Sequence, residues 1–108
     1  PRLHFMPSGK RTMASNGIQQ NRFVEALSLL KLQYQYIIID SGSISGSPVT
    51  LNCALSSDST FLVLRSRSTH WEAVGKAKHK LEIHQCHIGG IILNRRKKVI
   101  PEWLYKWI

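Results

Sequence analysis

The chain has few acidic side chains, few cysteines and no long apolar run. Only 6 of its 108 residues are Asp or Glu, against 15 Lys and Arg, so the formal net charge is +9. This excess favours an anionic partner such as a nucleotide, a nucleic acid, a phosphosugar or a lipid headgroup. No segment approaches the roughly 18 consecutive apolar residues that a membrane span needs. The composition therefore excludes the transmembrane, collagen-like, coiled-coil and disordered classes.

The two cysteines, Cys53 and Cys86, are too few for a disulfide framework and too far apart for a CxxC pair. The expected compartment is therefore the cytoplasm, including the inner face of the membrane if the chain has a membrane partner. With 43% apolar and 19% charged residues, the composition is that of a globular protein. The length suits one domain, so we expect a single α/β domain over residues 1–108.

Short apolar segments predict the strands. Residues 36–40 (YIIID) and 60–65 (TFLVLR) are rich in β-branched and aromatic side chains and lack polar alternation. This pattern is typical of strands that are covered on both faces of a parallel sheet. Residues 3–6 (LHFM) and 88–94 (IGGIILN) are also apolar enough for strands.

Helices are expected between these strands. The predicted helices cover residues 21–33, 48–55 and 70–83, with a last short one that opens at Pro101. Asn21, Ser47 and Thr69 are the expected N-caps, and Trp71 is expected on the buried stripe of the third helix. Alternating strands and helices favour βαβ crossovers. The predicted fold is a three-layer α/β architecture with flanking helices and a mostly parallel sheet of about four strands.

Polar residues close the predicted strands. Asp40 follows three isoleucines, and Arg65 and Asn94 end the two later strands. Open α/β sheets bind ligands beyond the carboxyl ends of their strands, so these residues are the first candidates for a site. A carboxylate at the position of Asp40 can hold Mg²⁺ through water, although an Asp at a strand end is also a common turn cap.

The order of these motifs resembles a known family. Residues 34–41 (YQYIIIDS) resemble the YDYIIIDTPP Walker B region of bacterial tyrosine kinases of capsule and exopolysaccharide synthesis, which belong to the MinD/ParA-like deviant P-loop ATPases. Residues 58–65 (DSTFLVLR), with Thr69 after them, and 89–94 (GGIILN) are similar to the aD..llVvR...T and i.GvvLN stretches of that family. Residues 3–9 (LHFMPSG) are similar to its l.vlpsG stretch, so the resemblance covers nearly all of the chain.

The resemblance implies a partial P-loop NTPase-like fold and a nucleotide site. It implies that Asp40 is the catalytic Walker B carboxylate and binds Mg²⁺. It also implies that Asn94 contacts the adenine base of ATP or ADP, and that the segment ending at Pro101 borders the nucleotide pocket. The implied partner is a membrane-associated polysaccharide co-polymerase that sets polymer length, or another copy of the chain.

The sequence departs from the family pattern at the phosphate-binding loop. No G-x-x-x-x-G-K-[ST] motif is present, and residues 8–10 (SGK) carry only one glycine and the lysine. Residues 41–43 (SGS) replace the family's Thr-Pro-Pro. We therefore expect a domain that is not self-sufficient for catalysis. A non-catalytic interaction module and a partitioning ATPase of the MinD/ParA type are the alternatives.

A basic run precedes the predicted last helix. Residues 95–98 (RRKK) lie near Trp103 and Trp107, a combination that can neutralise phosphates and stack on bases. The spacing of the two tryptophans is more typical of a docking face, and charge runs are commonly solvated loops. A nucleic-acid partner is therefore less favoured than docking to a membrane or a membrane protein, and a solvated loop is favoured over both.

Overall fold

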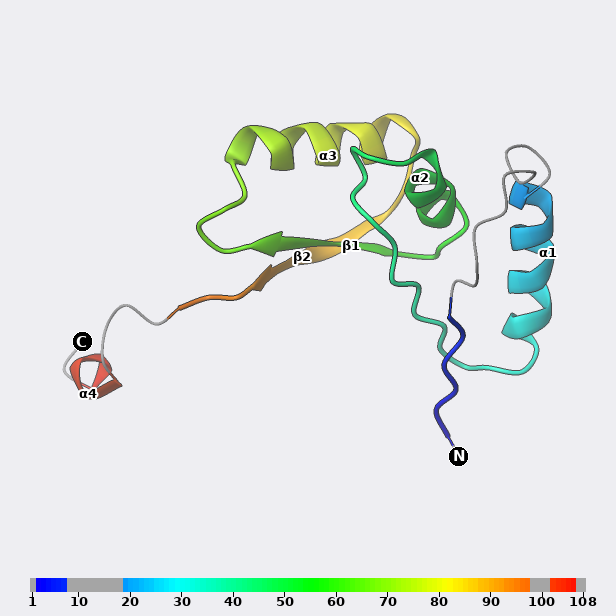
Figure 1. The fold of residues 1–108 in the computed structure, drawn as a ribbon, viewed down its shortest axis with the longest axis horizontal. Coiled ribbons are helices and arrows are strands. Elements are labelled where there is room, and N and C mark those ends of the chain that lie inside the picture. The colour runs from blue at the N-terminus through cyan, green and yellow to red at the C-terminus, as the bar shows by residue number, and fades with distance from the viewer. Residues whose placement is uncertain (1, 8–18, 98–101, 107–108) are drawn as a thin grey trace. The chain divides into compact units, whose positions relative to one another are not determined.

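The computed structural model describes residues 2–7, 19–97 and 102–106 of the chain. The chain divides into two compact units, Pro1–Ile38 and Ile39–Ile108, which are described separately below. The elements in chain order are α1 (Gln19–Lys31), α2 (Pro48–Leu55), β1 (Thr60–Arg65), α3 (Trp71–Ile83), β2 (Ile88–Asn94) and α4 (Glu102–Tyr105) (Figure 1). Among these helices, none has both the length and the apolar content to cross a bilayer.

The first unit contains the amphipathic helix α1. Leu27 is buried, Phe23 and Leu30 are half-buried, and most of the remaining described positions of the helix are exposed. The predicted cap at Asn21 was wrong, because α1 already begins at Gln19. Gln has a higher helix propensity than Asn, which favours continuing the helix through these positions. The rings of His4 and Tyr34 meet edge to face, with centroids 5.4 Å apart.

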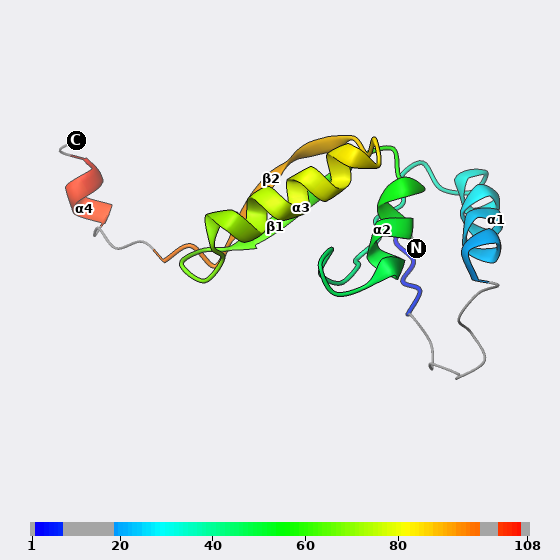
Figure 2. The same ribbon diagram turned by 90° about the horizontal axis from the view of Figure 1, so that it is seen from above.

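The second unit is built around a β1–α3–β2 unit. The two strands are parallel, with Leu62 opposite Ile91 and Arg65 opposite Asn94. The intervening helix α3 runs alongside both strands in the two views of Figures 1 and 2. The predicted strands at 60–65 and 88–94, and their parallel pairing, are confirmed.

The core of this unit lies between α3 and one face of the sheet. Leu81 is 0% exposed and Val74 is also buried, and both come from the helix. Side chains along β1 alternate between half-buried and exposed positions, as the period of a strand requires. Trp71, by contrast, is 83% exposed, so its predicted place on the buried stripe was wrong. It is the first residue of α3, at the end of the helix that lies beyond the buried positions.

Helix α2 begins as predicted. Pro48 occupies the first turn, where its missing N–H costs no hydrogen bond, and the Ser47 hydroxyl accepts a hydrogen bond from the Val49 N–H at 3.2 Å. The loop before the helix is tied to α3, because the Lys80 Nζ donates to the carbonyl oxygen of Ile44 at 3.0 Å. Thr50 and Ala54 are the buried residues of α2.

The predicted four-strand sheet was wrong for the described residues, which form a two-stranded sheet within a mixed α/β fold. Residues 3–6 and 36–40 are neither helix nor strand. Ile38 is 95% exposed and Phe5 is 89% exposed, whereas Ile37 and Ile39 are half-buried, so neither segment is covered on both faces. A strand exists only where its N–H and C=O groups meet a neighbouring ladder, and no described residue supplies one here. Apolar β-branched composition alone does not replace that partner.

The N-cap of α3 differs from the predicted one, and its C-terminal end has a defined cap. Thr69 is not the N-cap: its hydroxyl accepts a hydrogen bond from the Arg65 N–H at 3.1 Å, and His70 takes the cap position without a side-chain hydrogen bond. At the other end Gln85 has a φ of 58°, and the Cys86 N–H donates to the Leu81 carbonyl at 2.9 Å. This is the Schellman arrangement, which ends a helix through one left-handed residue.

Candidate functional site

The carboxyl ends of β1 and β2 meet at one edge of the sheet. Arg65 and Asn94 are register partners, and the Ser66 N–H donates to the Asn94 carbonyl oxygen at 2.9 Å. Both arrowheads in Figure 1 therefore end at the same side of the unit. In open parallel sheets this is the edge at which ligands bind. Two of the three strand-closing residues named from the sequence are thus brought together.

The side chain of Asn94 is held by its own chain. Its Oδ1 accepts a hydrogen bond from the Arg95 N–H at 2.8 Å, and Arg95 adopts a left-handed φ of 53°. A left-handed conformation costs a residue with a side chain about 1–2 kcal/mol, so this turn is maintained against a conformational preference. Asn94 is exposed, and its Oδ1 already accepts a hydrogen bond. Its NH₂ group is therefore the part of the side chain that is left to bind a ligand, as a hydrogen-bond donor.

Asp40 lies in the connection that leads to α2 and is exposed. It does not close a strand, because residues 36–40 form none. The loop after it is organised by serine: the Ser45 N–H donates to the Ser43 Oγ at 3.4 Å, and the Gly46 N–H donates to the Ser43 carbonyl at 3.1 Å. The sheet therefore does not hold Asp40 beside Asn94. Pro101, the third site residue expected from the resemblance, lies outside the described residues.

The described residues do not form a complete site for Mg²⁺ or a phosphate-binding loop. No group of three or more His, Cys, Asp or Glu side chains within them could hold a metal ion. Asp40 thus has no protein partners for a metal among these residues, and a lone exposed carboxylate holds Mg²⁺ weakly without phosphates. The glycine-rich loop that cradles phosphates is missing from the sequence. Among the candidate site residues that the structure describes, Asn94 is the one whose side chain is held by a hydrogen bond.

Cations gather around the same edge of the sheet. The turn after β1 carries Arg67 and the chain after β2 carries residues 95–97 (RRK), all of them exposed. The bond between Ser66 and Asn94 holds the two segments side by side. The nearest acidic residues in sequence are Glu72, five positions after Arg67, and Glu102, five positions after Lys97. We call Arg67, Arg95, Arg96 and Lys97 the basic edge.

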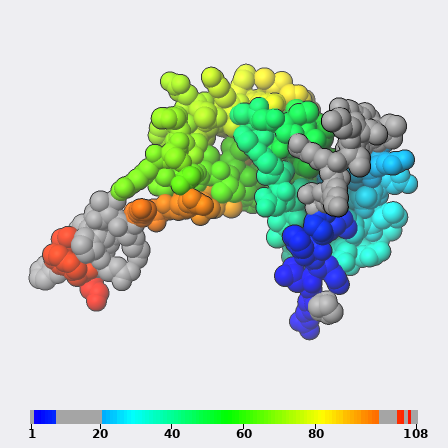
Figure 3. All heavy atoms as spheres, viewed as in Figure 1, coloured from blue at the N-terminus to red at the C-terminus, as the bar shows by residue number. Residues whose placement is uncertain are grey.

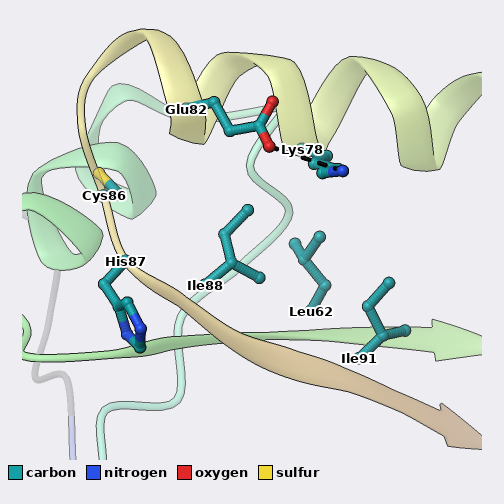
Figure 4. Close-up of a pocket in the computed structure, with 7 residues that line it drawn as sticks. All are labelled: Leu62, Lys78, Glu82, Cys86, His87, Ile88 and Ile91. Atoms are coloured by element: carbon teal, nitrogen blue, oxygen red, sulfur yellow. Dashed lines mark ion pairs between the residues drawn. The ribbon is translucent and has the colours of Figure 1, made fainter.

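A shallow groove under α3 was not anticipated from the sequence. Its volume is about 440 Å³, and it is lined by Leu62, Lys78, Glu82, Cys86, His87, Ile88 and Ile91. Figure 4 shows apolar side chains from both strands on its floor, with Lys78 and Glu82 of α3 on the other side. These two side chains form an ion pair at 3.6 Å. Their i, i+4 spacing on the helix was the one signal in the sequence that could have located this border.

The face of the sheet opposite α3 is apolar and open. Phe61, Val63 and Ile92 are 55%, 61% and 50% exposed. Val63 and Ile92 are register partners, and Phe61 lies opposite Gly90. The atoms of β2, in orange, lie at the surface of the unit in Figure 3. We call Phe61, Val63 and Ile92 the open face.

Neither cysteine has the environment of a catalytic nucleophile. Cys53 is half-buried in α2, and this burial raises the pKa of its thiol. A raised pKa lowers the thiolate fraction and with it the reactivity of the group. Cys86 is half-buried at the end of the groove, and its Sγ lies 3.9 Å from the His84 carbonyl oxygen.

Comparison of the chain with family models, with curated proteins and with solved structures returned no match. The function is therefore inferred from the residues of the chain and their arrangement.

Proposed function

We propose that this chain is the nucleotide-binding part of a P-loop ATPase-like domain, similar to the tyrosine kinases of capsule and exopolysaccharide synthesis. The observation that carries the proposal is the pairing of Arg65 and Asn94 at the carboxyl edge of a parallel β1–β2 pair. The segments that end at these residues are those that resemble the family motifs. The proposal has two grounds. One is the likeness of these segments to the family motifs, and the other is that open α/β sheets bind ligands at the carboxyl ends of their strands.

In this proposal Asn94 recognises the base and Arg65 the anion. The fixed amide of Asn94 donates from its NH₂ group to a ring nitrogen of adenine. The guanidinium of Arg65, which is exposed at the neighbouring position, neutralises phosphate oxygens. Mg²⁺ is assigned to Asp40 by resemblance alone. When bound, the metal would neutralise phosphate charge, and phosphoryl transfer would need a Walker A loop that the 108 residues do not contain.

The first experiment is calorimetry of the chain with ADP in the absence of metal. We expect Asn94→Ala to weaken ADP binding by about 2- to 10-fold, the range that corresponds to one net hydrogen bond. The matched control is Asn21→Ala on the exposed part of α1, which should leave ADP affinity unchanged. Undetectable ADP binding, or equal affinity in the Asn94 and Asn21 variants, would contradict the proposal.

The second experiment tests the metal role of Asp40. Asp40→Ala should reduce ADP affinity only when Mg²⁺ is present, because a carboxylate contributes to binding through the metal. Without Mg²⁺ the variant and the parent chain should bind ADP equally. An equal affinity of the two with Mg²⁺ would show that Asp40 is a loop residue.

One observation favours a non-catalytic interaction module as the second candidate. Parallel sheets are normally covered on both faces, whereas the open face of this one exposes Phe61, Val63 and Ile92. An uncharged strip of this kind can pack against the same strip of a second copy. Under this function the chain dimerises in sedimentation, Val63→Lys abolishes the dimer, and ADP does not bind. Sedimentation as a monomer at all concentrations would reject it.

A further inference from the structure

The basic edge combines four exposed cations within two short backbone segments. Arg67 follows Ser66 directly, and Arg95 follows Asn94 directly, so the hydrogen bond between Ser66 and Asn94 places the two segments together. Arg96 and Lys97 continue the second segment and are exposed. Like charges at this spacing repel one another, so the edge favours a polyanionic surface as a neighbour.

The backbone of the edge supports presentation of these cations. Both Arg67 and Arg95 adopt left-handed conformations, with φ values of 67° and 53°. Glycine or asparagine would take these conformations more easily, whereas here both positions carry an arginine. The turn at Arg67 is fixed further by the Thr69 hydroxyl, which accepts from the Arg65 N–H at 3.1 Å. Arg67 and Arg95 are therefore held in defined turns, and Arg96 and Lys97 extend from the second of these turns.

An exposed tryptophan follows the first of these two segments in the sequence. Trp71 is the first residue of α3, four positions after Arg67, and is 83% exposed. Tryptophan suits the headgroup level of a bilayer, because its apolar ring can contact the lipid chains while its N–H bonds to water or headgroups. Cations beside such a ring are attracted by the negative potential of acidic lipids.

We propose that the basic edge and Trp71 form a docking surface for an acidic phospholipid membrane. The proposal goes beyond the nucleotide site, because it uses neither Asn94 nor Asp40. Nucleic acid is the weaker match. Binding to single strands relies on several aromatic side chains that stack on successive bases along a basic groove, whereas Trp71 is the one Phe, Tyr or Trp side chain in residues 65–74, which cover the turn with Arg67 and the first turn of α3.

The test is co-sedimentation of the full chain with vesicles of phosphatidylcholine, with or without about a third phosphatidylserine. We expect binding to the acidic vesicles, none to pure phosphatidylcholine, and release as salt rises from about 0.1 to 0.5 M. Arg67→Gln with Arg96→Gln should weaken binding about 25-fold, from about five-fold per cation near a charged surface.

The matched control removes two exposed cations elsewhere, with Arg22→Gln and Lys76→Gln. It should weaken binding much less than the edge variant, although the net charge changes equally. Equal loss in both pairs would show a response to net charge alone and would overturn the proposal. Circular dichroism of each variant identifies any loss that comes from unfolding, and a single variant, Arg96→Gln, then replaces the pair.

Two further measurements separate this surface from its rivals. Trp71→Ala should lower vesicle affinity without changing the dependence on salt, because the ring contributes apolar rather than ionic binding. Equal or tighter binding of single-stranded DNA under the same salt conditions would assign the edge to nucleic acid instead. ADP binding is measured without vesicles and vesicle binding without ADP on the same parent chain, so failure of the nucleotide proposal and failure of this one remain distinguishable.

Discussion

Residues 36–40 and residues 88–94 are both rich in isoleucine, yet they have different structures. The second segment is strand β2, paired in parallel with β1 and lying beside α3. The first is neither strand nor helix, and its Ile38 is 95% exposed. The difference lies in the neighbours, because β2 has both a ladder and a covering helix. Apolar composition supplies the tendency to form a strand, and the ladder decides whether it forms.

The largest test of this comparison truncates one side chain in each region. Leu81→Ala removes a fully buried side chain of α3, so we expect the free energy of unfolding to fall by about 2–5 kcal/mol. Ile38→Ala removes a side chain already in solvent and should change stability by less than about 0.5 kcal/mol. Urea unfolding followed by circular dichroism measures both. Similar losses in the two variants would mean that residues 36–40 are packed after all.

A second prediction concerns the close approach of β2 to β1 at Gly89. A Cβ at this position would lie 2.8 Å from the Phe61 Cζ and closer still to the Ser59 Oγ. Gly89→Ala should therefore destabilise the unit by about 1 kcal/mol or less, because the atoms in the way are the ends of two exposed side chains that can move aside. Gly90→Ala is the matched control, since its Cβ would meet Phe61 at an ordinary 3.5 Å. Equal stability of the two variants in urea would contradict the described register.

The sequence predicted the β1–α3–β2 unit well, and the reason is local. Residues 60–65 and 88–94 carry strand composition, and the helix between them is long enough to connect parallel strands. The cap at Ser47 was also predictable, because Ser followed by Pro48 is a local signal. The predicted N-cap at Thr69 was wrong because the Thr69 hydroxyl accepts a hydrogen bond from the Arg65 N–H instead of capping α3. The local sequence pattern does not show which of these two hydrogen bonds forms.

The candidate site was predicted only in part. Arg65 and Asn94 meet because parallel strands must end at the same edge, which follows from fold class alone. The position of Asp40 required a third strand, whose existence depends on a ladder partner that sequence composition cannot supply. The basic run that begins at Arg95 was noted from the sequence, but its meeting with Arg67 and the groove beside Lys78 were not predicted. Both depend on which loops the sheet brings together.

A smaller prediction concerns the end of α3. Gln85 has a φ of 58°, a conformation that glycine adopts without steric cost. Gln85→Gly should therefore stabilise the β1–α3–β2 unit by about 1 kcal/mol. It should leave residues 36–40 unchanged, which would widen the difference between the two regions. Gln85→Ala keeps the Cβ and is the control, expected to give no gain. A loss of stability in the glycine variant would argue against the Schellman end.

The smallest expected effect is at Cys53, which reports on the packing of α2. Burial raises the pKa of its thiol in the folded chain, so less thiolate is present at mildly alkaline pH. In a Cys86→Ser background, alkylation of Cys53 should be slower in the folded chain than in urea. Folding is favoured while the thiol stays neutral, and this contribution is lost as pH rises through the raised pKa. Equal alkylation rates in the two states would mean that α2 does not cover the thiol.

The proposed nucleotide site lies at the edge of the sheet where β1 and β2 end. The most direct measurement is a map of backbone amide shifts in ¹⁵N-labelled chain during titration with ADP. We predict that the largest shifts fall at Arg65, Ser66, Asn94 and Arg95, and that Asn94→Ala reduces them at an ADP concentration near the Kd of the parent chain. Shifts confined to other parts of the chain, or shifts at this edge that persist unchanged in the variant, would contradict the nucleotide assignment.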